Sequence, residues 1–206
     1  VKILKSIFVI FHKIYLYQAI TYSTMCLTKR RKRKVKKLVL IDGNSIMNRA
    51  FYGIMGSKML TSKDGKYTNA IYGFLAIMFK IIEDLNPEYM AVAFDLKAPT
   101  FRHLEYAEYK AGRKAMPPEL AMQMPLMKQV LEAMRIPIYQ CQGWEADDII
   151  GTMAKKYSPT HRCIILTGDR DCLQLIDENV EVWLTKHGIS NIVSENLRQL
   201  KEDFGK

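Results

Sequence analysis

Short apolar runs alternate with amphipathic stretches along the chain from about residue 37. Brief runs rich in aliphatic and β-branched residues are typical of buried strands, and they occur at 37–42, 89–94, 136–139, 163–167 and 180–184. Apolar residues at helical spacing predict helices at 69–84, 117–134, 144–157 and 194–204. This alternation predicts an α/β domain with a mostly parallel central sheet and helices on both faces.

Acidic residues gather just past the predicted strands. Some follow strands directly, and others begin the helix that comes after the third strand. The set is Asp42, Asp95, Glu145, Asp147, Asp148, Asp169 and Asp171. Because the carboxyl ends of parallel strands face one edge of a sheet, where such folds bind ligands, we expect these side chains to converge on one crevice.

A cluster of carboxylates favours a metal site. Like charges at close range disfavour mutual ionisation, and a divalent cation removes that cost. Oxygen ligands without His or Cys suit Mg²⁺ or Mn²⁺, and two such ions about 4 Å apart can promote phosphodiester hydrolysis. Taken singly, the acids have plainer explanations: Asp42, Asp169 and Asp171 could belong to turns, and those at 145–148 could complement a helix dipole.

The net charge of +10 is concentrated at the N-terminus. Residues 1–37 hold 11 of the 31 Lys and Arg residues and no acid, so the rest of the chain is close to neutral. The longest unbroken apolar run there, Ile7 to Phe11, is too short for a membrane span, and no signal-peptide cleavage site follows. We therefore expect no membrane association through a spanning segment.

Three explanations remain for this basic arm. We favour a poorly ordered extension over residues 1–36, with Met25 as a possible alternative start. A DNA-tracking tail and a membrane-surface anchor are the alternatives. The folded domain is then expected at 37–206. Four cysteines without metal-ligand spacing favour a cytoplasmic protein with reduced thiols.

Several sequence blocks after residue 37 stand out together. The first is Leu-Val-Leu-Ile-Asp-Gly-Asn-Ser at 38–45, followed by Asn-Arg-Ala-Phe at 48–51. Further blocks lie at 70–74, 93–103, 109–113, 143–148 and 166–171. These blocks, in this order, resemble the 5′-nuclease (5′-3′ exonuclease) domain at the front of bacterial DNA polymerase I, a flap endonuclease-like domain of PIN-like or resolvase-like fold. The resemblance covers about residues 37–205.

The resemblance implies that all seven acids bind metal, with Asp42, Asp95, Asp169 and Asp171 at the centre of catalysis. It also implies that residues 97–116 form a helical arch through which a 5′ single strand passes. The basic positions of that family that would contact DNA are Arg49, Arg102, Lys110 and Arg113. Phe101, Tyr106 and Tyr109 between such cations suit a single strand, although a solvated loop of mixed charge would look similar.

The resemblance further implies a continuation past residue 206. In the family, a Gly-Asp-x-Ser-Asp-Asn stretch supplies more metal ligands and a helix-hairpin-helix unit then grips duplex DNA. We therefore expect an impaired second metal site and weak activity, unless a separate chain supplies that part. The expected function is a metal-dependent 5′-3′ exonuclease and 5′-flap endonuclease of DNA replication and repair. The alternatives are a non-catalytic DNA-binding remnant and a small RNA-cleaving nuclease.

Overall fold

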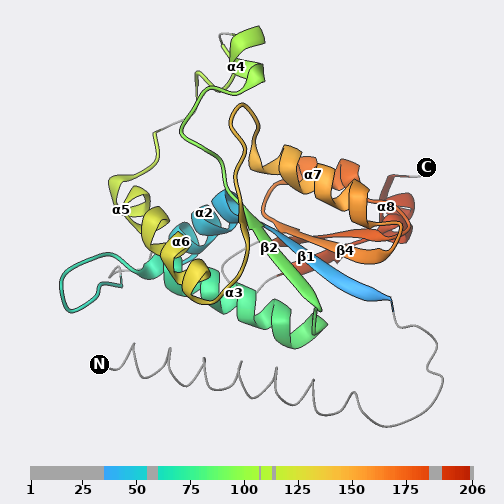
Figure 1. Ribbon diagram of the computed structural model, residues 1–206, viewed down its shortest axis with the longest axis horizontal. Helices are drawn as coiled ribbons and strands as arrows, with labels where there is room; N and C mark the ends of the chain where they lie inside the picture. Colours follow the sequence, from blue (N-terminus) through green and yellow to red (C-terminus); the bar gives the residue numbers. More distant parts are fainter. Residues whose placement is uncertain (1–34, 55–59, 107, 113–114, 186–191, 205–206) are drawn as a thin grey trace. The chain divides into compact units, whose positions relative to one another are not determined.

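A six-stranded sheet forms the centre of the domain in the computed structural model, which describes residues 35–54, 60–106, 108–112, 115–185 and 192–204 (Figure 1). The strand order is β3-β2-β1-β4-β5-β6. Strands β1 to β5 are parallel along the sheet, and β6 is antiparallel to β5. Their bounds are β1 Lys36–Asp42, β2 Tyr89–Ala93, β3 Ile138–Tyr139, β4 His161–Thr167, β5 Val180–Thr185 and β6 Ile192–Glu195.

Helices cover both faces of this sheet (Figure 1). On one face lie α2, α3, α5 and α6, and on the other lie α7 and the 3₁₀ helix η2. The bounds are α2 Gly43–Gly53, α3 Asn69–Leu85, α4 Phe101–Glu105, α5 Pro118–Ala121, α6 Gln123–Ala133, α7 Ala146–Tyr157, η2 Arg170–Leu175 and α8 Leu197–Phe204. The short helix α4 stands away from these two layers, above the ends of the strands (Figure 1).

The central strand β1 explains why both layers form. Val39 and Ile41 belong to the core on the α2–α3 side, whereas Leu38 and Leu40 belong to the core on the α7 side. Alternate side chains of a strand point to opposite faces, so a run that is apolar at every position needs cover on both. Each fully buried aliphatic side chain contributes about 1.5–3 kcal/mol relative to exposure, so β1 stabilises the packing of both layers.

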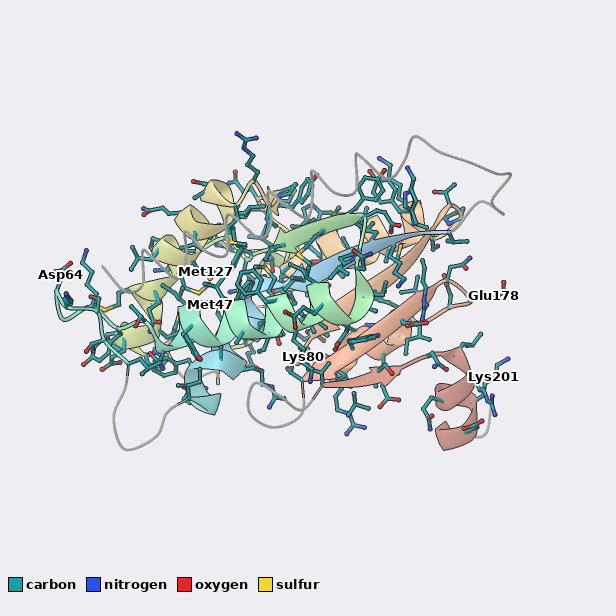
Figure 2. All side chains as sticks on the ribbon, turned by 90° about the horizontal axis from the view of Figure 1, so that it is seen from below. Met47, Asp64, Lys80, Met127, Glu178 and Lys201 are labelled. Carbon is teal, nitrogen blue, oxygen red and sulfur yellow. The ribbon has the colours of Figure 1, made fainter. Side chains whose placement is uncertain are left out.

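Two buried amides join the helices of the larger layer. Gln123 accepts a hydrogen bond from the backbone N–H of Ala70 at 2.9 Å and donates to Asn69 Oδ1 at 3.0 Å. Asn69 in turn donates to the carbonyl of Phe51 at 3.2 Å. Met47 of α2 and Met127 of α6 belong to the apolar core of the same layer (Figure 2). The network fixes α2, α3 and α6 relative to one another.

The structure confirms the predicted mostly parallel α/β fold and differs from the predictions at α2, in the helix predicted at 117–134 and at β6, among other places. Helix α2 was not expected, because Asp-Gly-Asn at 42–44 was interpreted as a turn; Asp42 instead accepts from Ser45 N–H and begins the helix. The helix predicted at 117–134 is two helices. Pro125 has no N–H to offer the carbonyl of Ala121, which interrupts the helical hydrogen bonds.

The third difference is the edge strand β6, which occupies the start of the helix predicted at 194–204. Its four residues are too few to show a strand pattern in the sequence, and its pairing with β5 defines it. The arm was predicted over residues 1–36, of which 1–34 lie outside the described residues, and Lys36 is the first residue of β1. Within the described ranges, no helix is long and apolar enough to cross a membrane.

Candidate active site

The carboxyl ends of three neighbouring strands bring three aspartates to one edge of the sheet. Asp42 is the last residue of β1, and the strand register places it beside the ends of β2 and β4. Asp95 and Asp169 each lie two residues beyond the end of their strand. The prediction that these acids share one edge of the sheet therefore agrees with the strand register.

Uncharged donors hold Asp42 in place. Its Oδ1 accepts from the backbone N–H of Ser45 at 3.0 Å, and its Oδ2 accepts from the hydroxyl of Thr167 at 3.0 Å. The Thr167 hydroxyl also accepts from the backbone N–H of Asp169 at 3.0 Å. One buried threonine thus connects the ends of β1 and β4.

Asp95 connects β2 to the first turns of two helices. Its Oδ1 accepts from the backbone N–H of Ala146 at 2.7 Å, at the start of α7. Its own N–H donates to Asn44 Oδ1 at 3.0 Å, in the first turn of α2. A carboxylate at a helix N-terminus is stabilised by the free N–H groups there, so the orientation of Asp95 is set by two elements at once.

These acids line an open cleft of about 790 Å³. All the predicted metal-binding acids except Asp148 contribute to its wall: Asp42, Asp95, Glu145, Asp147, Asp169 and Asp171. Polar side chains of α2 and basic and aromatic side chains of residues 97–116 complete the lining. The cleft therefore offers many oxygen donors, with cations at one rim.

Burial and like charges raise the pKa of two of the acids. Burial raises the pKa of Asp42 to about 6, the charges of Asp95 and Asp169 add to the effect, and the two hydrogen bonds to Asp42 oppose it. Burial also raises the pKa of Asp147, with the charge of Asp148 contributing. A bound cation would relieve this cost.

Glu145 and Asp148 have a different environment, because side chains from residues 97–116 reach them. Arg102 donates to both carboxylate oxygens of Asp148, at 2.6 and 2.7 Å. Lys110 donates to Glu145 Oε1 at 2.6 Å, and the Tyr109 hydroxyl donates to Oε2 at 3.0 Å. The predicted DNA-binding cations Arg102 and Lys110 are thus paired with predicted metal-binding acids.

These contacts lower the pKa of both acids. The hydrogen bond from Arg102 lowers the pKa of Asp148 against the opposing effect of burial. Burial would raise the pKa of Glu145, but hydrogen bonds from Lys110 and Tyr109 together outweigh it. The two acids are therefore held in the ionised form by charges within the chain.

The donor chemistry of the cleft fits a hard divalent cation, since its acidic wall supplies carboxylate oxygens and the His and Cys side chains that prefer zinc do not join it as a group. Among the residues that the structure describes, no three His, Cys, Asp or Glu side chains form a ready metal-binding group. Coordination would therefore involve some adjustment of the acidic side chains.

Arg49 and Arg113 complete the predicted DNA contacts. Arg49 lies on α2 and donates to the carbonyl of Gly168 at 3.1 Å, next to Asp169. A Cβ on Gly168 would come within 2.7 Å of Arg49 Nε, so a larger residue there would displace the Arg49 side chain. Arg113 lies outside the described residues. Their predicted contacts with DNA remain predictions.

Sequence reasoning missed the residues that orient the acids. Asn44, Ser45 and Thr167 hold Asp42 and Asp95 through the hydrogen bonds described above. For Ser45 a signal was present, because Asp at a helix N-cap accepts from the N–H three residues later. For Thr167 there was none, since its bond to Asp42 spans 125 residues.

Together, the fold and the cleft define a resolvase-like α/β domain that carries an acidic site at the carboxyl ends of its parallel strands. The chain belongs to the family described as the 5′-3′ exonuclease N-terminal resolvase-like domain, whose model matches residues 37–205. The resemblance found in the sequence is therefore confirmed.

Relatives agree with this assignment. The chain is 42% identical to DNA polymerase I of Bacillus subtilis over 171 residues, and 44% identical to DNA polymerase I of Geobacillus stearothermophilus over 170 residues. Each match covers 82% of this chain but 19% of the relative, so the chain spans about a fifth of the length of these proteins. The family is one of nucleases.

Solved structures show the same fold. The T5 D15 protein co-crystallised with metal ions matches with a TM-score of 0.60 and 16% identity, covering 82% of this chain and 60% of that one. T5 5′-exonuclease with bound divalent zinc ions matches with a TM-score of 0.59 and 17% identity, covering 82% and 61%. At these identities the likeness establishes the fold alone.

Proposed function

We propose that this chain is a divalent-metal-dependent 5′ nuclease that hydrolyses phosphodiester bonds of 5′-ended or flapped DNA and leaves a 5′-phosphate. The observation that carries the proposal is the convergence of acids from three strand ends and from the start of α7 on one open cleft. Basic side chains stand at the rim of the same cleft. Family membership supplies the nuclease chemistry.

The acids of the cleft would hold the cations. Asp42, Asp95, Asp169 and Asp171 line its wall, with Asp147 beside them. When bound, Mg²⁺ or Mn²⁺ would supply an activated water and stabilise the leaving oxygen, as pairs of ions do in other nucleases. Ser45, Thr167 and the N–H of Ala146 fix the acids beforehand, which limits the reorganisation that binding requires.

Basic side chains near the acids would bind the DNA backbone. Arg102 and Lys110 lie next to the cleft and Arg49 lies beside Asp169. Arg113 is assigned the same role from the resemblance. Phosphate contacts from such cations position a nucleic acid without reading its sequence, so binding should weaken steeply as salt is raised. Tyr109, between these cations, would stack on an unpaired base.

Cleavage of a labelled 5′-flap duplex in Mg²⁺ or Mn²⁺ tests the proposal. We expect a 5′-phosphorylated product from the wild-type chain and its loss in Asp95→Asn. Asp84→Asn, an exposed acid of α3 outside the cleft, is the matched control and should cleave normally. Because the chain spans about a fifth of its relatives, the assay includes a fusion to the segment that follows the matched region in the Bacillus subtilis enzyme.

The outcomes separate the candidates. Cleavage by the fusion alone would mean that the site needs a second segment, which a separate chain could provide. Flap binding without cleavage in either form, unaffected by Asp169→Ala and Asp171→Ala, would replace the proposal with a non-catalytic DNA-binding domain. Preferential cleavage of single-stranded RNA over the flap would identify the chain as an RNA-cleaving nuclease instead.

A further inference from the structure

A cluster of five side chains joins the described residues of the stretch 97–116, here called the arch segment, to the start of α7. Arg102 forms two hydrogen bonds with Asp148, and Lys110 and Tyr109 each donate to Glu145. Arg102 also lies 3.4 Å from Glu145, so the two acids share one cation. We call this cluster the arch–α7 contact.

Every carboxylate oxygen of the two acids accepts a hydrogen bond from the arch segment. Both oxygens of Asp148 accept from Arg102, and each oxygen of Glu145 has a donor within 3.0 Å. The side chain of Glu145 is 8% exposed and that of Asp148 is 18% exposed, so the pairs are shielded from water more than ordinary surface pairs. A bidentate pair with arginine is among the strongest that a carboxylate makes.

A second contact anchors the beginning of the arch segment. The N–H of Phe101 donates to the carbonyl of Gly143 at 3.0 Å, and its ring lies 4.9 Å from that of Trp144. This anchor does not use the acids. The arch segment can therefore lose its ion pairs with Glu145 and Asp148 and remain attached through Phe101.

We propose that the arch segment and divalent cations compete for Glu145 and Asp148, so that cation binding frees Arg102 and Lys110 for a phosphodiester backbone. The inference rests on the proposed function and adds to it a coupling between the metal site and the DNA-binding side chains. Within the chain, Arg102 and Lys110 provide the positive charge that a bound cation would otherwise provide. This coupling is reciprocal: the factor by which a bound metal ion weakens the contacts of Arg102 and Lys110 with the acids equals the factor by which those contacts weaken metal binding.

Manganese affinity, measured by calorimetry or electron paramagnetic resonance without DNA, tests the competition. Arg102→Gln removes the competitor of Asp148, and we expect Mn²⁺ to bind on the order of 10-fold more tightly. Arg162→Gln is the matched control, because it breaks a similar arginine–carboxylate pair with Glu181, on neighbouring strands. Its Mn²⁺ affinity should equal that of the wild type. Equal or weaker affinity in Arg102→Gln would overturn the proposal.

Trypsin cleavage after Lys110 gives an independent measurement on the unmodified chain. We expect Mn²⁺ to accelerate this cleavage, because it releases the Lys110 side chain from Glu145. Cleavage after Lys66, an exposed residue of the hairpin before α3, should not change. In Glu145→Gln, Lys110 should be cut rapidly with or without Mn²⁺. A rate at Lys110 that is slow and unaffected by Mn²⁺ in both forms would contradict the competition.

Neither measurement depends on nuclease activity. A chain that shows the competition but never cleaves DNA would leave this inference intact and overturn the proposed function. A chain that cleaves the flap but binds Mn²⁺ equally well with and without Arg102 would support the proposed function and overturn this inference. Absence of any Mn²⁺ binding would overturn the competition outright.

Discussion

Two groups of acids lie in or beside the cleft, and their charges are stabilised in opposite ways. At the strand ends, the described hydrogen bonds to Asp42 come from uncharged donors, and burial raises its pKa to about 6. At the start of α7, Glu145 and Asp148 accept from Lys110 and Arg102, and the pKa of each is lowered. Burial therefore dominates at Asp42, whereas cations of the chain dominate at Glu145 and Asp148.

This difference predicts that neutralising an acid has opposite effects in the two groups. The largest effect is expected for Asp42→Asn. The pKa of Asp42 is about 6 in the folded protein and near 4 in the unfolded chain. The free energy of unfolding of the wild type therefore falls as the pH rises from about 4 to 6, and it stays lowered above pH 6. Removing the charge should raise the free energy of unfolding by about 3 kcal/mol at pH 7.5.

Urea unfolding in EDTA at pH 7.5 and at pH 4 measures this effect, and the gain should disappear at the lower pH. The same substitution should lower flap cleavage by more than about 100-fold. Substituting a residue that only hydrogen-bonds to a metal ligand already lowers activity by about 10- to 100-fold. A loss of stability at pH 7.5 would show that Asp42 is compensated by a charge after all, and the comparison would fail.

Thr167→Val tests how far uncharged donors support the strand-end group. The valine removes the donor to Asp42 and the acceptor for the N–H of Asp169, both at a fully buried position. We expect the free energy of unfolding to fall by about 2 kcal/mol. Thr160→Val, which alters an exposed hydroxyl, should change it little. Equal effects of the two substitutions in urea would deny Thr167 its supporting role.

Asp148→Asn should have the opposite sign to Asp42→Asn. The substitution removes the charged partner of Arg102. Because the Arg102 side chain is partly exposed, the free energy of unfolding should fall by only about 1 kcal/mol at pH 7.5. The lowered pKa of Asp148 stabilises the fold above the unfolded value near 4, and that contribution is lost as the pH falls through the folded pKa. Asp84→Asn is the control, and stabilisation by Asp148→Asn in the same unfolding assay would contradict the contrast.

The sequence was sufficient to predict the strand-end group. Short buried strands followed by acids identify Asp42, Asp95 and Asp169, and parallel pairing brings such ends to one edge whatever the details of packing. Helix α2 escaped prediction because its first residues favour a turn, and Gly43 accommodates the Phe94 ring through a contact that is not local in sequence.

The arch–α7 contact was beyond sequence reasoning. Arg102 and Asp148 are 46 residues apart, and the arch segment carries charges of both signs without a regular period. Which cation meets which acid depends on the path of the chain after β2 and on the anchor between Phe101 and Trp144. The basic residues were therefore predicted as DNA contacts, and their pairing with Glu145 and Asp148 emerged only from the fold.

Tyr109→Phe should have the smallest effect and separates hydrogen bonding from charge within the arch–α7 contact. The substitution removes the donor to Glu145 Oε2 but keeps the ring and leaves Lys110 on Oε1. We expect a loss of about 0.5 kcal/mol in the free energy of unfolding, because Glu145 retains a charged partner. Tyr139→Phe, an exposed tyrosine on β3, is the control. A loss as large as that of Asp148→Asn would mean that the hydroxyl, and not the cations, holds the arch segment to α7.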